Sequence, residues 1–429
     1  MPVNLPEIIP ASLNPIQGIR LGWAESNIKQ PNRKDLLVIE IADGSAVSGV
    51  FTQNRFCAAP VTLCKKHLNA VKNNDVLGTN VSGANVSGIK ALVINTGNAN
   101  AGTGEQGMVD ALTTCENLAE IMAIPAESIL PFSTGVILEH LPMDKLLAGL
   151  PHAVANLTAD NWADAASAIM TTDIAPKAYA THVNIGEDRV NITGISKGSG
   201  MIHPNMATML GYVATDANIT QSLLDSMTKE IADLSFNCIS VDGDTSTNDS
   251  FIVIATGKSN AAPIKNRNDE GFTEIFNALL ATAQYLAKAI VRDGEGATKF
   301  ITVTVKGALT NDEAKTIGYS IAKSPLVKTA MFASDPNLGR VLAAIGYASR
   351  ECKSLEDLDT EQLELYFGDL LVAEKGGRAA SYIEKEAQAV MDEAEINITV
   401  QLHRGIEQAT IWTCDFSYDY VKINAEYRT

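Results

Sequence analysis

The chain has 429 residues, of which 46% are hydrophobic and 19% are charged, and its formal net charge is −17. This length predicts two or three domains, and this composition is that of a folded globular protein rather than a disordered one. The acidic balance argues against a surface for nucleic acid or anionic lipid, because phosphate groups would be repelled by it.

The first half of the chain alternates short apolar runs with segments of helical periodicity. A turn containing Asp43 and Gly44 separates the first two predicted strands, and this dipeptide is typical of a hairpin. The predicted strands cover residues 36–41, 46–52, 60–64, 91–95, 129–132, 182–185 and 189–196, the last two forming a pair. The predicted helices cover residues 65–71, 109–123 and 161–170, the second of which stops before Pro125.

The second half continues in the same manner. Helices are predicted at residues 221–236, 271–291, 311–324 and 340–347, and strands at residues 209–215, 250–256, 299–305, 366–372, 396–402, 408–415 and 418–424. Neighbouring strands outnumber clean strand–helix–strand units. We therefore expect an α+β fold of packed layers and not a doubly wound sheet.

Two polar loops raise the question of a bound ion. Residues 96–104 are dense in glycine and asparagine and could offer backbone N–H groups to an anion, but Thr103 stands where a Walker A loop requires lysine. In residues 241–249, Asp242 and Asp244 fit the first and third positions of a calcium loop, whereas the required glycine and final glutamate are missing. A solvated turn or an active-site wall is favoured there over a cation site.

The N-terminus and the cysteines indicate the compartment. Residues 1–6 lack a basic stretch followed by an apolar block, and no window reaches the roughly 18 uninterrupted apolar residues of a membrane helix. The six cysteines and six histidines are scattered, without CxxC or HxxxH pairs. We expect reduced thiols, no metal site and a cytoplasmic location.

The stretch at residues 197–210, KGSGMIHPNMATML, contains the strongest candidate for catalysis. If the Ala207–Thr208 peptide bond were broken, Thr208 would carry a nucleophilic hydroxyl and also an α-amine. With a reference pKa near ~8, that amine can act as a base at neutral pH. Taken alone, however, a threonine at the start of a strand is usually structural.

The longer run KGSGMIHPNMATMLGYVATDA resembles the self-cleavage signature of the ornithine acetyltransferase family, the bifunctional glutamate N-acetyltransferases of arginine biosynthesis. A second match is DPNLGR at residues 335–340, where Leu338 replaces the usual tryptophan, a departure that concerns local packing rather than chemistry. The resemblance implies a layered α/β sandwich of the N-terminal-nucleophile type. It also implies a precursor that cleaves itself between Ala207 and Thr208 into interlocked chains of residues 1–207 and 208–429.

The resemblance assigns roles to residues spread over nearly the whole chain. Thr208 corresponds to the nucleophile, and Thr134 and Gly135 correspond to the element that stabilises the oxyanion. The implied substrate-binding residues are Thr171, Lys197, Thr208, Glu295, Asn424 and Thr429. Thr172 lies next to Thr171, so either of these two threonines fits the family's binding threonine.

The implied reaction moves an acetyl group from N2-acetyl-L-ornithine to L-glutamate through an acetyl-Thr208 intermediate, with ping-pong kinetics. The resemblance implies no cofactor and no metal, and it leaves open whether acetyl-CoA is a further acetyl donor. It also implies an α2β2 assembly of cleaved pairs without nucleic acid or membrane partners. Two alternatives are a related aminopeptidase or amidohydrolase, with water as acceptor, and an uncleaved amino-acid-binding protein.

Overall fold

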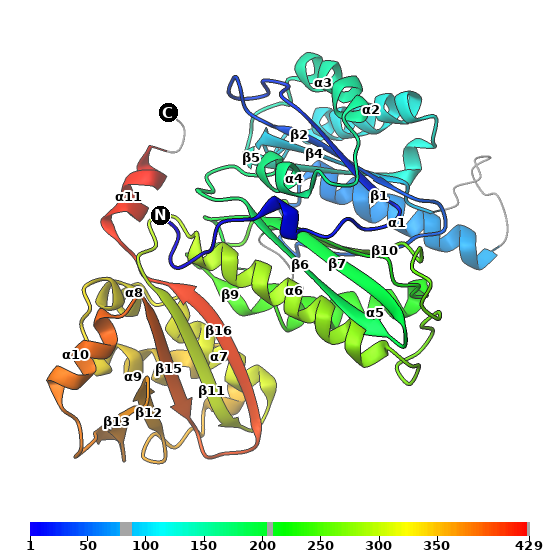
Figure 1. Cartoon of the computed structure of the whole chain (residues 1–429). Coiled ribbons are helices and arrows are strands. Elements are labelled where there is room, and N and C mark those ends of the chain that lie inside the picture. Colours follow the sequence, from blue (N-terminus) through cyan, green and yellow to red (C-terminus); the bar gives the residue numbers. More distant parts are fainter. Residues whose placement is uncertain (78–87, 204–208, 427–429) are drawn as a thin grey trace.

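The computed structural model describes residues 1–77, 88–203 and 209–426, with the backbone alone described for residues 72–77. A larger part is built on two stacked sheets, and a smaller part, at the lower left of Figure 1, is built on a third sheet. Within the described ranges, no helix is long and apolar enough to cross a membrane. All six cysteines are free thiols in the structure.

The first sheet is apolar on both faces because both faces are buried. Leu37 and Ile39 point into the core shared with the second sheet, whereas Leu36 and Val38 point into a separate core under the covering helices. Its strands, in spatial order, are β1 (Ile19–Ala24), β2 (Leu36–Ile41), β4 (Ala91–Asn98) and β5 (Ile129–Val136). The outer face is covered by α2 (Gly104–Met122) and α3 (Met143–Ala155).

The second sheet is buried in the same way, with Ile252 and Ile254 facing the first sheet and Phe251 and Val253 facing outward. Its strands are β3 (Ala46–Phe51), β10 (Ser250–Ala255), β8 (Leu210–Thr215), β7 (Asp188–Lys197) and β6 (Lys177–Ile185). Its outer face is covered by α5 (Gln221–Asp233) and α6 (Phe272–Arg292). Two further helices, α1 (Ala59–Leu77) and α4 (Trp162–Ala168), contribute to the core between the sheets.

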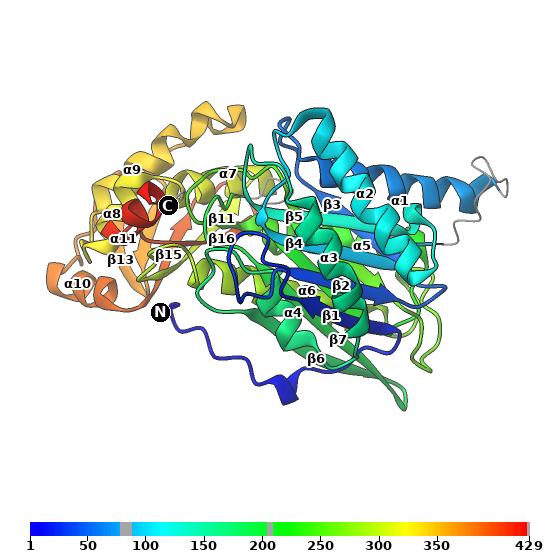
Figure 2. The ribbon, with the colours of Figure 1, turned by 90° about the horizontal axis from the view of Figure 1, so that it is seen from above.

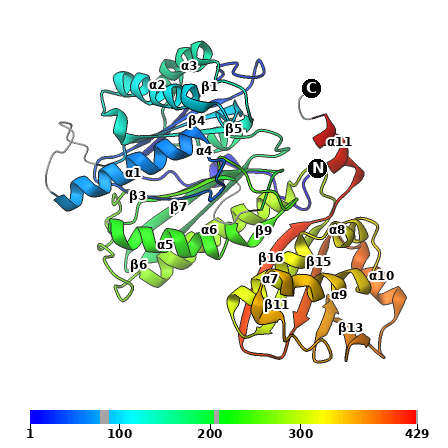
Figure 3. The same ribbon diagram turned by 180° about the vertical axis from the view of Figure 1, so that it is seen from behind.

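The larger part is therefore a sandwich of four layers, helix–sheet–sheet–helix. Seen from behind in Figure 3, α2 and α3 lie on one side of the two sheets and α5 and α6 lie on the other. This arrangement confirms the predicted α+β class and the layered sandwich.

The smaller part has its own core around β11 (Phe300–Ala308). The spatial order of the third sheet is β14 (Gly377–Arg378), β13 (Leu370–Glu374), β12 (Glu364–Phe367), β15 (Glu395–Gln401), β11, β16 (Glu407–Cys414) and β9 (Ile239–Ser240). Its helices are α7 (Asn311–Ala322), α8 (Pro325–Phe332), α9 (Leu338–Tyr347) and α10 (Glu384–Asp392), and α11 (Tyr418–Ala425) follows β16.

The N-terminal segment links the two parts. In Figure 2 this segment runs along the larger part and ends beside the smaller one. The backbone N–H of Val3 donates to the carbonyl of Arg292 at the end of α6 (2.8 Å), and Arg292 forms an ion pair with Glu395 of β15 (2.8 Å). The short parallel pairing of β9 with β16 makes a second connection.

Several predicted elements are wrong, and each error has a local cause. The predicted hairpin does not form, because β2 and β3 belong to different sheets and the turn with Gly44 carries the chain between them. Residues 60–64 are helical: Val61, Cys64 and Leu68 lie on one buried face of α1. Residues 366–372 are not one strand but the two strands β12 and β13, reversed at Gly368.

The predicted strand at residues 418–424 is also wrong, since these residues form α11, with the Ser417 hydroxyl accepting from the Tyr420 N–H (3.4 Å) at its start. The antiparallel pairing of β6 with β7 is confirmed. The other predicted elements each coincide with an observed helix or strand whose ends lie within several residues.

Candidate active site

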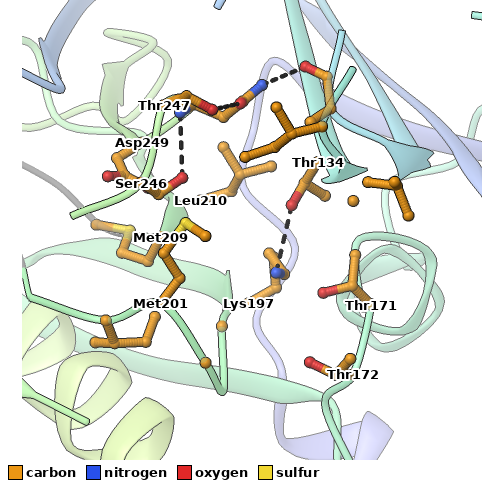
Figure 4. A pocket seen from close by; sticks show the side chains of 18 of the residues that line it. Thr134, Thr171, Thr172, Lys197, Met201, Met209, Leu210, Ser246, Thr247 and Asp249 are labelled. Atoms are coloured by element: carbon orange, nitrogen blue, oxygen red, sulfur yellow. Dashed lines mark hydrogen bonds between the residues drawn. The ribbon is translucent and has the colours of Figure 1, made fainter. Parts of the chain in front are cut away.

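A cavity of about 270 Å³ opens where β5 and β7 end and β8 begins. It is lined by six of the predicted site residues, which come from five separate segments of the chain: Thr134, Gly135, Thr171, Lys197, Glu295 and Asn424. Ala207, Thr208 and Thr429 lie outside the described residues. Met209 and Leu210, which directly follow position 208, line the same cavity (Figure 4).

Gly135 allows two strands to approach each other at the cavity wall. Its φ is 134°, a conformation that L side chains rarely adopt, and a Cβ there would lie 2.3 Å from the carbonyl carbon of Gly97 on β4. The parallel register of β4 and β5 shifts at this point, between Gly97 and Asn98. The backbones of β4 and β5 thus approach each other closely at Gly135, a position that only glycine can occupy without strain.

Lys197, the last residue of β7, reaches across the cavity to Thr134 (Figure 4). Its Nζ lies 3.4 Å from Thr134 Oγ1. An ammonium group has donors only, so the Thr134 oxygen must accept from it. The hydroxyl hydrogen of Thr134 is then free to point into the cavity, where it can donate to an oxygen that becomes negatively charged.

The surroundings of Lys197 control its charge. Burial lowers the pKa of the Lys197 ammonium, since it disfavours the charged form, and Lys177 lowers it further. The carboxylates of Asp173, Asp249 and Glu295 act in the opposite direction.

Asp173 lies next to Lys197, and its side chain is fully buried. Its carboxylate accepts from Lys177 Nζ (2.7 Å) and from the backbone N–H groups of Gly198 (2.7 Å) and Thr171 (2.9 Å). Lys197 Nζ is 3.9 Å away. Burial opposes ionisation of this carboxyl, but Lys177 and Lys197 outweigh that effect and hold the pKa of Asp173 well below its usual range.

Glu295, just beyond α6, is held from both sides. Its carboxylate accepts from the Thr172 hydroxyl (2.8 Å) and from Asn424 Nδ2 of α11 (2.8 Å). A Cβ at Gly200 would lie 2.4 Å from the carboxyl carbon of Glu295, so the absence of a side chain at Gly200 leaves room for this carboxylate. Thr171 and Thr172 both line the cavity, and Figure 4 shows both hydroxyls on the side that faces Lys197.

Residues 246–249, at the end of the acidic loop, form one wall of the cavity. Asn248 Nδ2 donates to the carbonyls of Ala99 (2.6 Å) and Ser133 (2.9 Å) and so fixes the loop to the ends of β4 and β5. Asp242 accepts from the N–H groups of Met201 (2.6 Å) and Ile202 (2.9 Å). In the described parts of the chain, no group of three or more histidine, cysteine or acidic residues could hold a metal ion.

Sequence reasoning missed Asp173, Asn248 and Gly200. Asp173 directly follows the two candidate threonines in the sequence, and this position was a usable signal. Asn248 could have been suspected from the polar character of its loop. Nothing in the sequence identifies Gly200, because the close contact with Glu295 joins residues 95 positions apart.

The fold and the cavity define a layered α+β protein with a polar cavity at the ends of two stacked sheets. The ArgJ family profile matches residues 20–429. The chain belongs to the ArgJ family.

Individual relatives agree with this assignment. The chain is 86% identical to the arginine biosynthesis bifunctional protein ArgJ of Colwellia psychrerythraea and 54% identical to that of Neisseria meningitidis serogroup A, in both cases over the full length of both proteins. A crystal structure of ArgJ from Bacillus halodurans is 38% identical and covers 51% of this chain and 99% of that chain, with a TM-score of 0.48.

Proposed function

We propose that this cavity transfers an acetyl group through a covalent ester on Thr208. As an ArgJ family member, the chain is an acyltransferase of arginine biosynthesis that moves acetyl from N2-acetyl-L-ornithine to L-glutamate. The observation that carries the proposed site is the meeting of Thr134, Gly135, Lys197 and Glu295 in one cavity beside Met209.

The active enzyme is formed by self-cleavage. The Thr208 hydroxyl attacks the carbonyl of Ala207, the acyl group shifts from nitrogen to oxygen, and hydrolysis of the ester releases residues 1–207 from residues 208–429. The two chains stay together, because the second sheet contains β3, β6 and β7 from the first chain and β8 and β10 from the second. Backbone pairing of β7 with β8 and of β3 with β10 then holds the cleaved halves in one sheet.

In the transfer reaction, the free α-amine of Thr208 takes the proton from its own hydroxyl, which attacks the acetyl carbonyl of N-acetylornithine. Thr134 and Gly135 stabilise the oxyanion. Because its hydroxyl accepts from Lys197, Thr134 has its hydrogen free for this role. The Thr208 ammonium passes its proton to the departing nitrogen, so that ornithine leaves. The amine of glutamate then attacks the acetyl ester, which forms N-acetylglutamate and restores the Thr208 hydroxyl.

The charged residues suit the two amino-acid substrates. Lys197 offers an ammonium to a substrate carboxylate, and Glu295, supported by Thr172 and Asn424, offers a carboxylate to a substrate ammonium. We assign the binding role to Thr171, whose hydroxyl makes only a long contact with Asp173 (3.5 Å), whereas the Thr172 hydroxyl contacts Glu295 (2.8 Å) and Ser199 (2.7 Å). Thr429 completes the substrate-binding residues.

Family membership does not support the aminopeptidase or amidohydrolase alternative. The relatives are named bifunctional proteins, which favours acetyl-CoA as a second acetyl donor for glutamate. No diffusible cofactor enters the mechanism. The cleaved pairs assemble as α2β2 in the cytoplasm, where six free thiols remain reduced.

The decisive experiment compares the wild type with Thr208→Ala and Thr208→Ser on a denaturing gel and by intact mass. The wild type should give two fragments that begin at residues 1 and 208, and N-acetylornithine should add one acetyl group to the second. Thr208→Ala should remain one inactive chain of 45.6 kDa, whereas Thr208→Ser should retain cleavage. Full turnover by an uncleaved Thr208→Ala chain would refute the proposal.

A further inference from the structure

Four buried or nearly buried charges form a continuous row beneath the cavity. Asp293, at the end of α6, lies 2.5 Å from Lys177 Nζ, Lys177 lies 2.7 Å from Asp173, and Asp173 lies 3.9 Å from Lys197. The side chains of Asp293, Lys177 and Asp173 are completely buried, and that of Lys197 is 10% exposed. The row contains two carboxylates and two ammonium groups, so it is electrically balanced.

Maintaining such a row has an energetic cost, because each charge has lost its water. The proposed reaction uses only Lys197 directly. The strand β6, the loop before it and the end of α6 supply the other three charges. Apolar side chains could fill the same space equally well, so packing alone does not explain these three charges.

We propose that Asp173 is the positioning residue of this site, whose carboxylate holds Lys197, Gly198 and Thr171 in one geometry and thereby orients the oxyanion donor Thr134. This proposal rests on the function proposed above. Among the described residues, Asp173 has no contact with Thr134 and does not line the cavity, so it acts through Lys197 and through two backbone N–H groups.

The first effect is geometric. One oxygen of Asp173 accepts from the Gly198 N–H (2.7 Å) and the other accepts from the Thr171 N–H (2.9 Å). A single carboxylate thus joins the segment after α4 to the end of β7, and both segments line the cavity. Gly198 has φ 147°, so this hydrogen bond also fixes a backbone turn that glycine permits.

The second effect is electrostatic. A protonated Lys197 can only donate to Thr134, which leaves the Thr134 hydrogen free for the oxyanion. A neutral Lys197 has a lone pair and can accept that hydrogen, which removes the donor from the cavity. The negative charge of Asp173 favours the protonated state, together with Asp249 and Glu295, whereas burial and Lys177 oppose it.

The test is the pH profile of kcat/KM for acetyl transfer by the mature enzyme, with Asp173→Asn compared with Asp293→Asn. Both changes remove a completely buried carboxylate from Lys177. Among contacts between described residues, Asp293 bonds Lys177 and the N–H groups of Ile174 and Ala175 but does not reach Lys197, which makes it a matched control.

In Asp173→Asn, the alkaline limb of the profile should move to lower pH by about 1–3 units, because an opposite charge at this distance shifts a pKa by that amount. On that limb, kcat/KM should fall about tenfold for each unit of the shift. In Asp293→Asn, the limb should stay at the wild-type position, whatever the effect on protein yield. An equal shift in both variants, or no shift in either, would overturn the proposal.

A second variant covers the case in which Asp173→Asn does not mature. Asp173→Glu keeps the charge but moves the carboxylate by one methylene. It should show the wild-type alkaline limb with a kcat at least about tenfold lower, and a wild-type kcat would contradict the geometric part. Absence of cleavage and transfer in the wild type itself would instead count against the proposed function.

Discussion

Gly135→Ala tests whether the close approach of β4 and β5 positions the oxyanion element. The added Cβ would lie 2.3 Å from the carbonyl carbon of Gly97 and 2.5 Å from the nitrogen of Asn98, whereas ordinary contacts begin at 3.4 Å. The two strand ends must therefore separate by about 1 Å. Because both contacting atoms belong to the backbone, no side-chain rotation can relieve the clash. A misplacement of this size typically lowers kcat by about 100-fold.

The positive φ of Gly135 means that an alanine there also loses stability through backbone strain. A substitution at a second glycine with positive φ measures this strain separately. Gly186, in the turn between β6 and β7, has φ 60°, but a Cβ there meets no heavy atom of the described residues within 4 Å. Gly186→Ala should therefore lose about 1–2 kcal/mol of stability from backbone strain and keep its turnover.

The assay measures kcat for N-acetylornithine and glutamate, together with the melting temperature, for both variants after maturation. Gly135→Ala should show the full loss of kcat and the larger fall in melting temperature. Equal turnover by Gly135→Ala and Gly186→Ala would refute the argument that the 2.3 Å contact controls the site.

Three further changes probe other contacts of the cavity. Thr134→Val removes the hydroxyl that Lys197 orients, so kcat should fall about 10²–10³-fold with little change in KM. Thr134→Ser should keep most of the activity, and initial rates of both variants would test this difference. Glu295→Gln removes the negative charge held by Thr172 and Asn424 and should raise KM for N-acetylornithine about tenfold or more, and an unchanged KM would argue against a role in binding. Asp242→Asn leaves the N–H groups of Met201 and Ile202 with a weaker acceptor, so cleavage should slow in a gel time course while fully cleaved protein turns over normally; cleavage at the wild-type rate would count against it.

The sequence was sufficient to predict most element positions but not their partners. Residues 36–41 and 46–52 were correctly identified as strands, because short runs rich in apolar and β-branched residues are typical of buried strands. Both faces of β2 and β3 are buried, however, so the apolar pattern of each strand does not indicate the sheet to which it belongs. The turn with Gly44 was compatible with a hairpin and equally with a crossing between sheets.

The site was predicted where chemistry depends on residue type and missed where it depends on long-range packing. Thr134, Lys197 and Glu295 matched a family pattern, and the cavity contains all three. Asp173 received no role, because its importance comes from Lys177 and Gly198, which reach it only after β6 and β7 pair. The helix α11 was taken for a strand, since its alternating polar and apolar residues lack a buried face that would reveal the helical period.

The composite second sheet has a consequence for how the mature protein unfolds. Before cleavage, β7 and β8 belong to one polypeptide, so melting and recovery involve a single molecule. After cleavage, the same loss of structure sets two molecules free, and recovery requires them to meet again. The melting temperature of the mature enzyme should therefore rise with protein concentration, and dilution after melting should prevent recovery, whereas Thr208→Ala should respond less to both changes.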